Sequence, residues 1–264
     1  MNRKVINIIL GAAILGCAAF TAYSVLRVRQ IDNVYDTAAG LYSDISDKYA
    51  ATASQDGEGD EDIECTPISI DFDALQEECT DGTVVGWLYC DDGVINYPVV
   101  QGSDNYYFLE HLIDGSENAS GTLFVDVRNH ADWSDRNTVI YGHHMSDQSM
   151  FGSLYKYRSQ EYAAEHPVMY LNTPSSGDYK LVFIGCYIDE TDTLAFKTNF
   201  GSDSEYLEFL NYSSQHFMNP AEDTLTVEDN VITLITCSYE ANNVRQVTVL
   251  KMVPVAPYKE TKVN

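Results

Sequence analysis

The sequence VITLITC at positions 231–237 is an unbroken run of β-branched and apolar residues that ends in a cysteine. Runs of this kind favour a strand. A polar turn follows at positions 238–243, and a second strand-like run, VRQVTVL, begins at position 244. A short loop between two strands makes a hairpin, so we expect Cys237 on the last rung of one strand and Arg245 on the first rungs of the next.

This hairpin would place a thiol beside a fixed positive charge at one edge of a sheet. The charge favours the thiolate, which is the nucleophilic form, so the pattern indicates an activated nucleophile. Taken alone, a cysteine in an apolar strand is more often a small core residue, because free cysteine is among the most buried residue types. Other parts of the sequence have to decide between the two interpretations.

Further strand-like runs, separated by turn signals, occur along the chain after residue 70. Their spacing predicts a mainly β domain over residues 71–258, built as an antiparallel barrel or sandwich. Two helical insertions are expected at 149–164 and 202–217, and Asp71 is a candidate N-cap of a short helix. The expected strands are 84–90, 94–100, 121–127, 137–142, 168–171, 179–187, 225–227, 231–237 and 244–253.

An uncharged apolar segment occupies residues 5–26. As a helix it reaches about 33 Å, enough to span the core of a bilayer. We therefore expect an uncleaved transmembrane anchor, with residues 1–4 as a cytoplasmic tip and the acidic remainder outside the cell. A cleaved signal peptide and a lipoprotein signal at Cys17 are the alternatives, but the apolar run continues beyond Cys17.

The anchor and the β domain are joined by residues 27–70. Residues 27–51 have apolar side chains at near-helical spacing, whereas residues 54–62 are acidic and lack apolar side chains. We expect a helical stalk followed by an acidic linker. Residues 259–264 are expected to form a short C-terminal tail.

The composition limits the possible partners and cofactors. The 264 residues carry a formal net charge of −25, which excludes binding to nucleic acid by counterion release. None of the 6 cysteines has a CxxC or Cys/His spacing typical of zinc sites. We therefore expect neither a metal nor a cofactor.

A second strand-like run ends in the sequence TVIYGHHM at positions 138–145. A histidine at a strand end is exposed, and its pKa lies near working pH, so it is suited to proton transfer. Because side chains alternate along a strand, only one of His143 and His144 is expected to face Cys237. Asp126 and Asp135 precede them, but nothing in the sequence places either carboxylate against the imidazole, and we interpret both as structural.

Taken together, these elements resemble the sortases, the membrane-anchored cysteine transpeptidases of Gram-positive bacteria. The run TLITC at 233–237 fits the Thr-Leu-x-Thr-Cys signature of that family, His143 matches its Gly-His element, and Arg245 matches its downstream arginine. The similarity extends over residues 71–254. It looks like class B, because NYPVVQG at 96–102, FVD at 124–126 and YGHHM at 141–145 are typical of that class.

The resemblance implies a fold and a reaction. The fold would be a closed antiparallel β-barrel with peripheral helices, an N-terminal helical extension and one transmembrane helix. Cys237 would attack the threonine carbonyl in a C-terminal sorting motif of a secreted protein and form a thioester. His143 would exchange protons with the departing and incoming amines, and Arg245 would position the motif and stabilise the carbonyl oxygen.

The resemblance also implies the reaction partners. The sorting motif would be of the Asn-Pro-x-Thr type, and an amine of a peptidoglycan precursor or stem peptide would resolve the thioester. Asn105, Leu109 and Thr236 would line the groove for the motif. Two alternatives remain: a cysteine endopeptidase that releases its product to water, and a non-enzymatic surface module with a buried Cys237.

Overall fold

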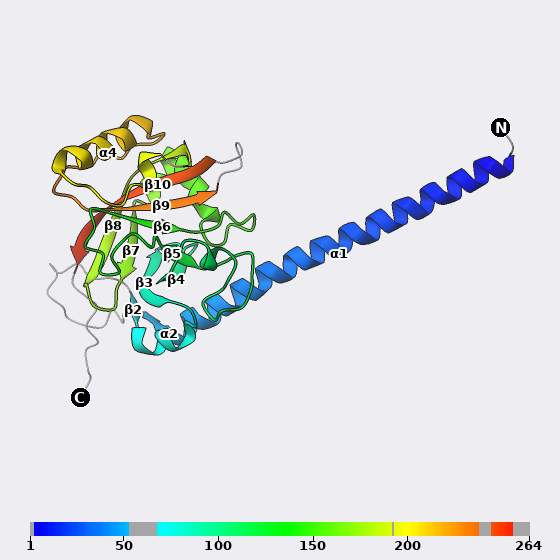
Figure 1. Ribbon diagram of the computed structural model, residues 1–264, viewed down its shortest axis with the longest axis horizontal. Helices are drawn as coiled ribbons and strands as arrows, with labels where there is room; N and C mark the ends of the chain where they lie inside the picture. Colours follow the sequence, from blue (N-terminus) through cyan, green and yellow to red (C-terminus); the bar gives the residue numbers. More distant parts are fainter. Residues whose placement is uncertain (1–2, 53–67, 192, 238–243, 256–264) are drawn as a thin grey trace.

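The computed structural model describes residues 3–52, 68–191, 193–237 and 244–255, and within these ranges it leaves the side chains of residues 3–16, 18, 31, 52 and 237 undescribed. The expected linker at 54–62, the turn at 238–243 and the tail at 259–264 lie outside the described residues. The described part of the chain consists of a closed β-barrel and a long N-terminal helix that extends away from it (Figure 1).

Eight strands close the barrel in the order β10-β8-β7-β3-β4-β5-β6-β9. The hairpin predicted from the sequence is confirmed, because β9 and β10 pair antiparallel with Cys237 opposite Arg245. The barrel strands are β3 Thr83–Cys90, β4 Asn96–Gln101, β5 Leu123–Val125, β6 Asn137–Tyr141, β7 Val168–Asn172, β8 Asp178–Glu190, β9 Val231–Cys237 and β10 Val244–Val255.

The barrel is mixed, so the prediction of a wholly antiparallel barrel is wrong. β4 runs parallel to β5, and β6 runs parallel to β9. Parallel neighbours require a crossover connection, and the chain between β6 and β9 makes one by passing through two other barrel strands and several helices before it returns. Strand propensity does not specify which neighbour a strand pairs with, and for that reason the sequence did not predict this pairing.

The interior of the barrel holds a continuous apolar core. The side chains of Trp87, Leu88 and Leu234 are fully buried there, and residues 231–236 of β9 are buried without exception. This explains why β9 has no alternating polar face: a strand covered on both faces is rich in apolar and β-branched residues throughout, and here Thr233 and Thr236 are buried with the rest. A second cluster, including Tyr187 and Phe209, lies between the outer surface of the barrel and helix α4.

Three of the four α-helices begin at a residue whose side chain caps the helix. Asp71 accepts a hydrogen bond from Ala74 N (3.1 Å), and Ser202 accepts one from Glu205 N (3.3 Å), as expected of N-cap residues. Both predicted helical insertions are confirmed. The helices are α1 Arg3–Tyr49, α2 Phe72–Glu78, α3 Gln160–Glu165 and α4 Asp203–His216, with short 3-10 helices η1 Tyr107–Leu109, η2 Gly152–Arg158 and η3 Leu194–Phe196.

Two predicted elements differ from the structure. Residues 225–227 are not a strand, because the backbone N–H and the hydroxyl of Thr226 both bind the carboxylate of Asp229 and turn the chain. The stalk helix ends at Tyr49, where strand β1 (Ala50–Thr52) begins and pairs with β2 (Ile68–Ile70).

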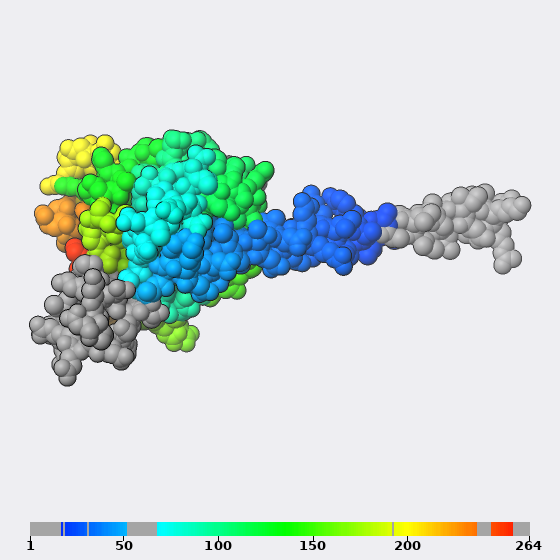
Figure 2. All heavy atoms as spheres, turned by 90° about the horizontal axis from the view of Figure 1, so that it is seen from below, coloured from blue at the N-terminus to red at the C-terminus, as the bar shows by residue number. Residues whose placement is uncertain are grey.

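The last turns of α1 pack on the barrel (Figure 2). Ala38, Tyr42, Ile45 and Tyr49 recur at helical spacing and are buried in the main core cluster. Within the described part of the chain, no helix contains a stretch long and apolar enough to cross a membrane. The side chains of residues 5–16, which belong to the predicted anchor, lie outside the described residues.

Candidate functional site

The backbone of β9 and β10 brings Cys237 and Arg245 together. They are directly opposed Cα partners at the end of the hairpin, where the sequence predicted them. The side chain of Cys237 lies outside the described residues. Its position is therefore given by the strand register, which places it two residues beyond Ile235.

The parallel pairing of β6 with β9 brings His143 to the same edge of the barrel. Tyr141 is the partner of Ile235, and Gly142 N donates to the Ile235 carbonyl (3.2 Å). His143 lies two residues beyond Tyr141, as Cys237 lies two residues beyond Ile235. The hydroxyl of Thr233 also donates to Asn137 Oδ1 (2.6 Å), which ties the two strands together by their side chains. The pairing therefore places His143 and Cys237 at neighbouring positions.

Gly142 allows the chain to make this approach. A Cβ atom at position 142 would collide with Leu123 Cδ2 and would lie 2.7 Å from Phe151 Cδ2. Any larger residue would therefore force either these two side chains or the chain that carries His143 to shift.

A cleft of about 370 Å³ opens at this edge of the barrel. It gathers five of the six predicted site residues, namely Asn105, Leu109, His143, Thr236 and Arg245. The other lining residues are Tyr106, Phe124, Tyr141, Gly142, Thr191, Phe196 and Ile235.

The imidazole of His143 is half-buried in the cleft. Its Nε2 atom lies 2.7 Å from the carbonyl oxygen of Leu109. His144 does not line the cleft among the described residues; its ring packs 6.3 Å from that of Tyr155, measured between centroids. The two adjacent histidines therefore lie in different environments, as strand alternation predicted.

Arg245 is half-buried, and its guanidinium remains available to a ligand. Its Nη1 atom donates to the carbonyl of Val244 (3.0 Å), and no carboxylate in the described part of the chain pairs with it. A guanidinium has five N–H donors, so most of its donor capacity is unused. This arrangement suits a group that binds a carbonyl oxygen or an oxyanion.

Asn105 and Thr236 present polar groups at the cleft. Asn105 Oδ1 accepts a hydrogen bond from Val127 N (2.8 Å), which fixes the amide and leaves its NH₂ group as a donor. The Thr236 hydroxyl is buried and has no hydrogen-bond partner among the described residues. Leaving such a buried hydroxyl unpaired is energetically costly.

The wall formed by Tyr141 and Phe196 is held by a buried carboxylate. Asp126 accepts hydrogen bonds from the Tyr141 hydroxyl (2.8 Å) and from two guanidinium nitrogens of Arg128 (2.9 and 2.7 Å), and Arg128 donates to the Phe196 carbonyl (3.0 Å). Burial raises the pKa of Asp126, but the hydrogen bonds from Arg128 and Tyr141 outweigh it and the pKa is lowered. Asp126 is thus an ionised support of the cleft wall.

Asp135 binds His130 and Asn129 at 2.8 and 2.9 Å. The hydrogen bonds described for Asp126 and Asp135 therefore go to groups other than His143. In the described part of the chain, no three His, Cys, Asp or Glu side chains are arranged to hold a metal ion.

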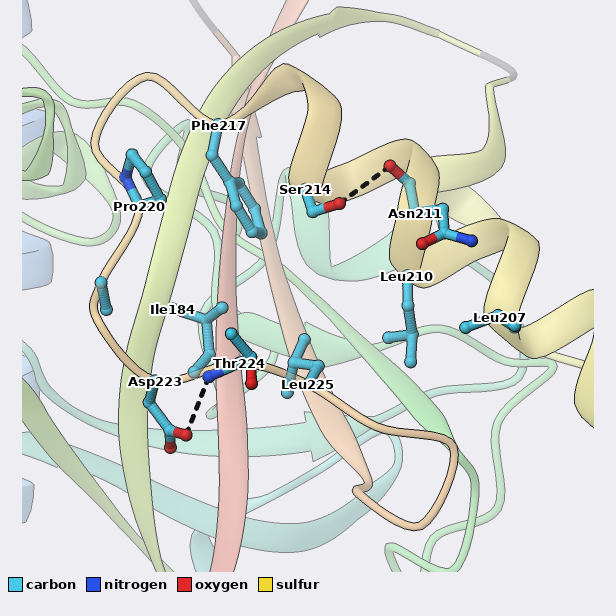
Figure 3. Close-up of a pocket in the computed structure, with 11 residues that line it drawn as sticks. Ile184, Leu207, Leu210, Asn211, Ser214, Phe217, Pro220, Asp223, Thr224 and Leu225 are labelled. Carbon is cyan, nitrogen blue, oxygen red and sulfur yellow. Dashed lines mark hydrogen bonds between the residues drawn. The ribbon is translucent and has the colours of Figure 1, made fainter.

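Several cleft residues carry no signal in the sequence. Thr191 and Phe196 come from the connection between β8 and α4, and Tyr106 precedes η1. They reach the cleft only because the barrel closes and folds their loops over its end. A separate hollow of about 230 Å³, between α4 and the loop after it, is lined by none of the predicted site residues (Figure 3).

Comparison with known proteins identifies the family. No family model matches the chain. Sortase B of Listeria monocytogenes is 30% identical over 207 residues, which cover 78% of this chain and 78% of the relative. The chain belongs to the sortase B family.

Two solved sortase B structures support the assignment. One is a substrate complex from Staphylococcus aureus, and the other is a complex with triglycine. Each is 30% identical to this chain, with a TM-score of 0.65. Each match covers 70% of this chain, and it covers 85% of the first solved chain and 86% of the second. As a sortase B homologue, the protein is a cysteine transpeptidase of the kind that anchors proteins to the cell wall.

Proposed function

We propose that this sortase B homologue cleaves an Asn-Pro-x-Thr sorting motif near the C-terminus of secreted proteins and joins the threonine to an amine of the cell wall. The observation that carries the proposal is the cleft. It gathers His143 and Arg245 at the edge of the barrel where β9 ends in Cys237. An imidazole and a guanidinium beside a strand-end cysteine are the groups that acyl transfer by a thiolate requires.

In the proposed reaction, the Cys237 sulfur forms a bond to the threonine carbonyl carbon. The oxygen takes up negative charge and is stabilised by Arg245. The C–N bond then breaks, and His143 gives its proton to the departing amine. An incoming amine attacks the thioester and loses a proton to His143, a new C–N bond forms, and the thiolate leaves.

The substrate would lie across the polar groups of the cleft. The NH₂ group of Asn105 and the side chain of Leu109 would contact the motif, with Thr236 beside them in the lining of the cleft. The substrate complex and the triglycine complex of the solved relatives support a peptide donor and an amine acceptor for this family. The acceptor here would be the amine of a peptidoglycan precursor or stem peptide.

We further propose that residues 5–26 anchor the protein in the cell membrane, with residues 71–258 as the catalytic domain outside the cell. The uncharged apolar segment supports this placement, since its length suffices for a bilayer.

The proposal is tested by trapping the acyl-enzyme. The full chain in detergent is incubated with a peptide containing Asn-Pro-x-Thr, and mass spectrometry should find the N-terminal fragment attached to Cys237 as a thioester. Added triglycine should convert it to an amide product. A peptide with alanine in place of the threonine is the control. If the fragment is released only as a free acid in the presence of triglycine, the protein is an endopeptidase; if no thioester forms with any sorting peptide, the proposal is wrong.

Arg245→Lys should lose most of the activity, by about 10²- to 10³-fold in kcat/KM, the cost typical of removing one oxyanion donor. An ammonium is a point charge and cannot reproduce the planar donor pair of a guanidinium. Lys251→Arg, farther along the same strand, is the matched control and should be near normal, because its partners Asp223 and Asp229 lie on the surface. Near-normal kinetics for Arg245→Lys would remove Arg245 from the site.

A further inference from the structure

The ring of His143 has a defined proton position. A main-chain carbonyl can only accept a hydrogen bond, so the contact of 2.7 Å between Nε2 and the Leu109 oxygen requires the proton on Nε2. Nδ1 is then the nitrogen left to exchange a proton with the reacting amines. In cysteine and serine hydrolases, the side chain of an acidic or amide residue fixes the tautomer of the histidine in this way.

No carboxylate has that role among the hydrogen bonds of the described residues. Asp126 binds Tyr141 and Arg128, and Asp135 binds His130. We infer that the backbone carbonyl of Leu109 is the positioning group that orients the imidazole of His143 and fixes its tautomer, and that helix α1 holds this carbonyl in place through Tyr42 and Gly121. The inference deepens the proposed function, on which it rests.

The Leu109 carbonyl belongs to a rigid turn. Leu109 ends η1, and the side chain of Phe108 before it is 1% exposed. The Phe108 carbonyl accepts a hydrogen bond from Thr122 N (2.9 Å). The peptide planes on this side of His143 are therefore tied to the segment that leads into β5.

Gly121 is the point of closest approach between the two segments. Its φ angle is +60°, and a Cβ atom built there would collide with the Phe108 carbonyl oxygen and lie 3.0 Å from the Leu109 carbonyl oxygen. Only glycine tolerates both the left-handed backbone and this contact. A side chain at position 121 would push directly on the group that faces His143.

Helix α1 contacts the segment around Gly121 and Thr122 through the side chain of Tyr42. The side chain of Tyr42 is 3% exposed. Its hydroxyl donates to the Gly121 carbonyl (2.8 Å) and lies 2.9 Å from the Thr122 hydroxyl. About two turns earlier on the same helix, the Tyr35 hydroxyl lies 2.8 Å from the hydroxyl of Ser146, three residues beyond His143. The stalk helix thus contacts both the segment that orients the imidazole and the loop that carries it.

The test reads the tautomer directly. The full chain, labelled with ¹⁵N-histidine, is examined by NMR over a range of pH, and the tautomer is read where the ring signals are those of the neutral form. The His143 signals are assigned by their loss in His143→Gln. We expect the wild-type ring to carry its proton on Nε2. A ring protonated on Nδ1 would overturn the inference, whatever the activity.

Two variants test what holds the carbonyl. Gly121→Ala should give a mixture of tautomers and lower kcat by about 10²-fold, since a displacement of about 1 Å at a catalytic group has a cost of that size. Gly115→Ala is the control: it has φ +80° and a collision with Thr80, so it carries the same kind of strain elsewhere. It should leave the tautomer unchanged. A pure Nε2 tautomer in Gly121→Ala would overturn the inference, even if kcat falls.

Tyr42→Phe provides a milder probe in case Gly121→Ala does not fold. Loss of the buried hydroxyl, which contacts both the Gly121 carbonyl and the Thr122 hydroxyl, should lower kcat about fivefold with little change in KM, together with a partial shift of the tautomer. Tyr49→Phe removes a hydroxyl from the same helix, one that binds Glu78 (2.6 Å), and should change neither quantity. Equal effects of the two variants would overturn the role of α1. Retained turnover in His143→Gln would instead refute the proposed function, independently of the tautomer.

Discussion

Replacing Cys237 with alanine is expected to abolish thioester formation and lower kcat/KM by about 10⁴-fold or more, with the fold retained. The loss of a nucleophile is among the largest single effects in enzymes of this type. The described thiols buried in the domain cannot replace it. Burial raises the pKa of Cys79, that of Cys90 to about 12 and that of Cys186 to about 11, so these three thiols stay protonated at working pH.

Peptide hydrolysis, amide transfer and thermal unfolding measured together check this expectation. Cys17→Ser is the control, because Cys17 is exposed and belongs to α1, not to a barrel strand. Alkylation by iodoacetamide at pH 7 adds an independent test, read by peptide mass spectrometry in the Cys17→Ser background. Rapid modification of Cys237 is expected, whereas Cys90 and Cys186 should be spared. If Cys237→Ala still cleaves the peptide, Cys237 is not the nucleophile. A Cys237 thiol that does not react with iodoacetamide would favour a binding module.

The second large effect concerns the adjacent histidines. His143→Ala should lower kcat by about 10²- to 10⁴-fold, the usual contribution of a general acid–base group. His144→Ala should have a much smaller effect, because the His144 ring lies outside the cleft, near Tyr155. Steady-state kinetics measured across pH show which histidine transfers the proton. Only His143→Ala should remove the part of the pH dependence of kcat that comes from proton transfer.

Each histidine variant serves as the control for the other, because both change the same type of side chain in adjacent positions. Thermal unfolding of both variants separates lost stability from lost chemistry. The opposite ranking of the two kcat values would reassign the proton-transfer group to His144.

The sequence predicted those parts of the fold that depend on local rules. The strand β9 and the hairpin that opposes Cys237 and Arg245 follow from strand propensity, helix α2 follows from its Asp71 cap, and helix α4 follows from the helical spacing of its apolar residues. Alternation along a strand predicted that only one of His143 and His144 would face the cleft, and the resemblance of the Gly-His element to that of the sortases selected His143.

The remaining features depend on contacts between distant segments, which local rules do not specify. The parallel pairing of β6 with β9 is one such feature, and it sets how His143 approaches Cys237. The cleft wall is another, since Phe196 comes from an irregular connection and is held by Arg128. The contact of the Leu109 carbonyl with His143 could not be predicted for a different reason. Almost every residue carries the same backbone groups, so a sequence does not show which carbonyl orients an imidazole.

The contact between Tyr35 and Ser146 fixes how far the cleft can lie from the membrane surface if the protein is anchored through α1. With residues 5–26 as the proposed anchor, about nine residues of helix separate Leu26 from Tyr35, so this contact lies at most about 14 Å above the lipid surface. With such an anchor, the cleft would be kept within a thin layer next to the lipids. Reactants tethered to the same bilayer share that layer and meet the enzyme at a raised effective concentration, which a freely diffusing form of the protein would lose.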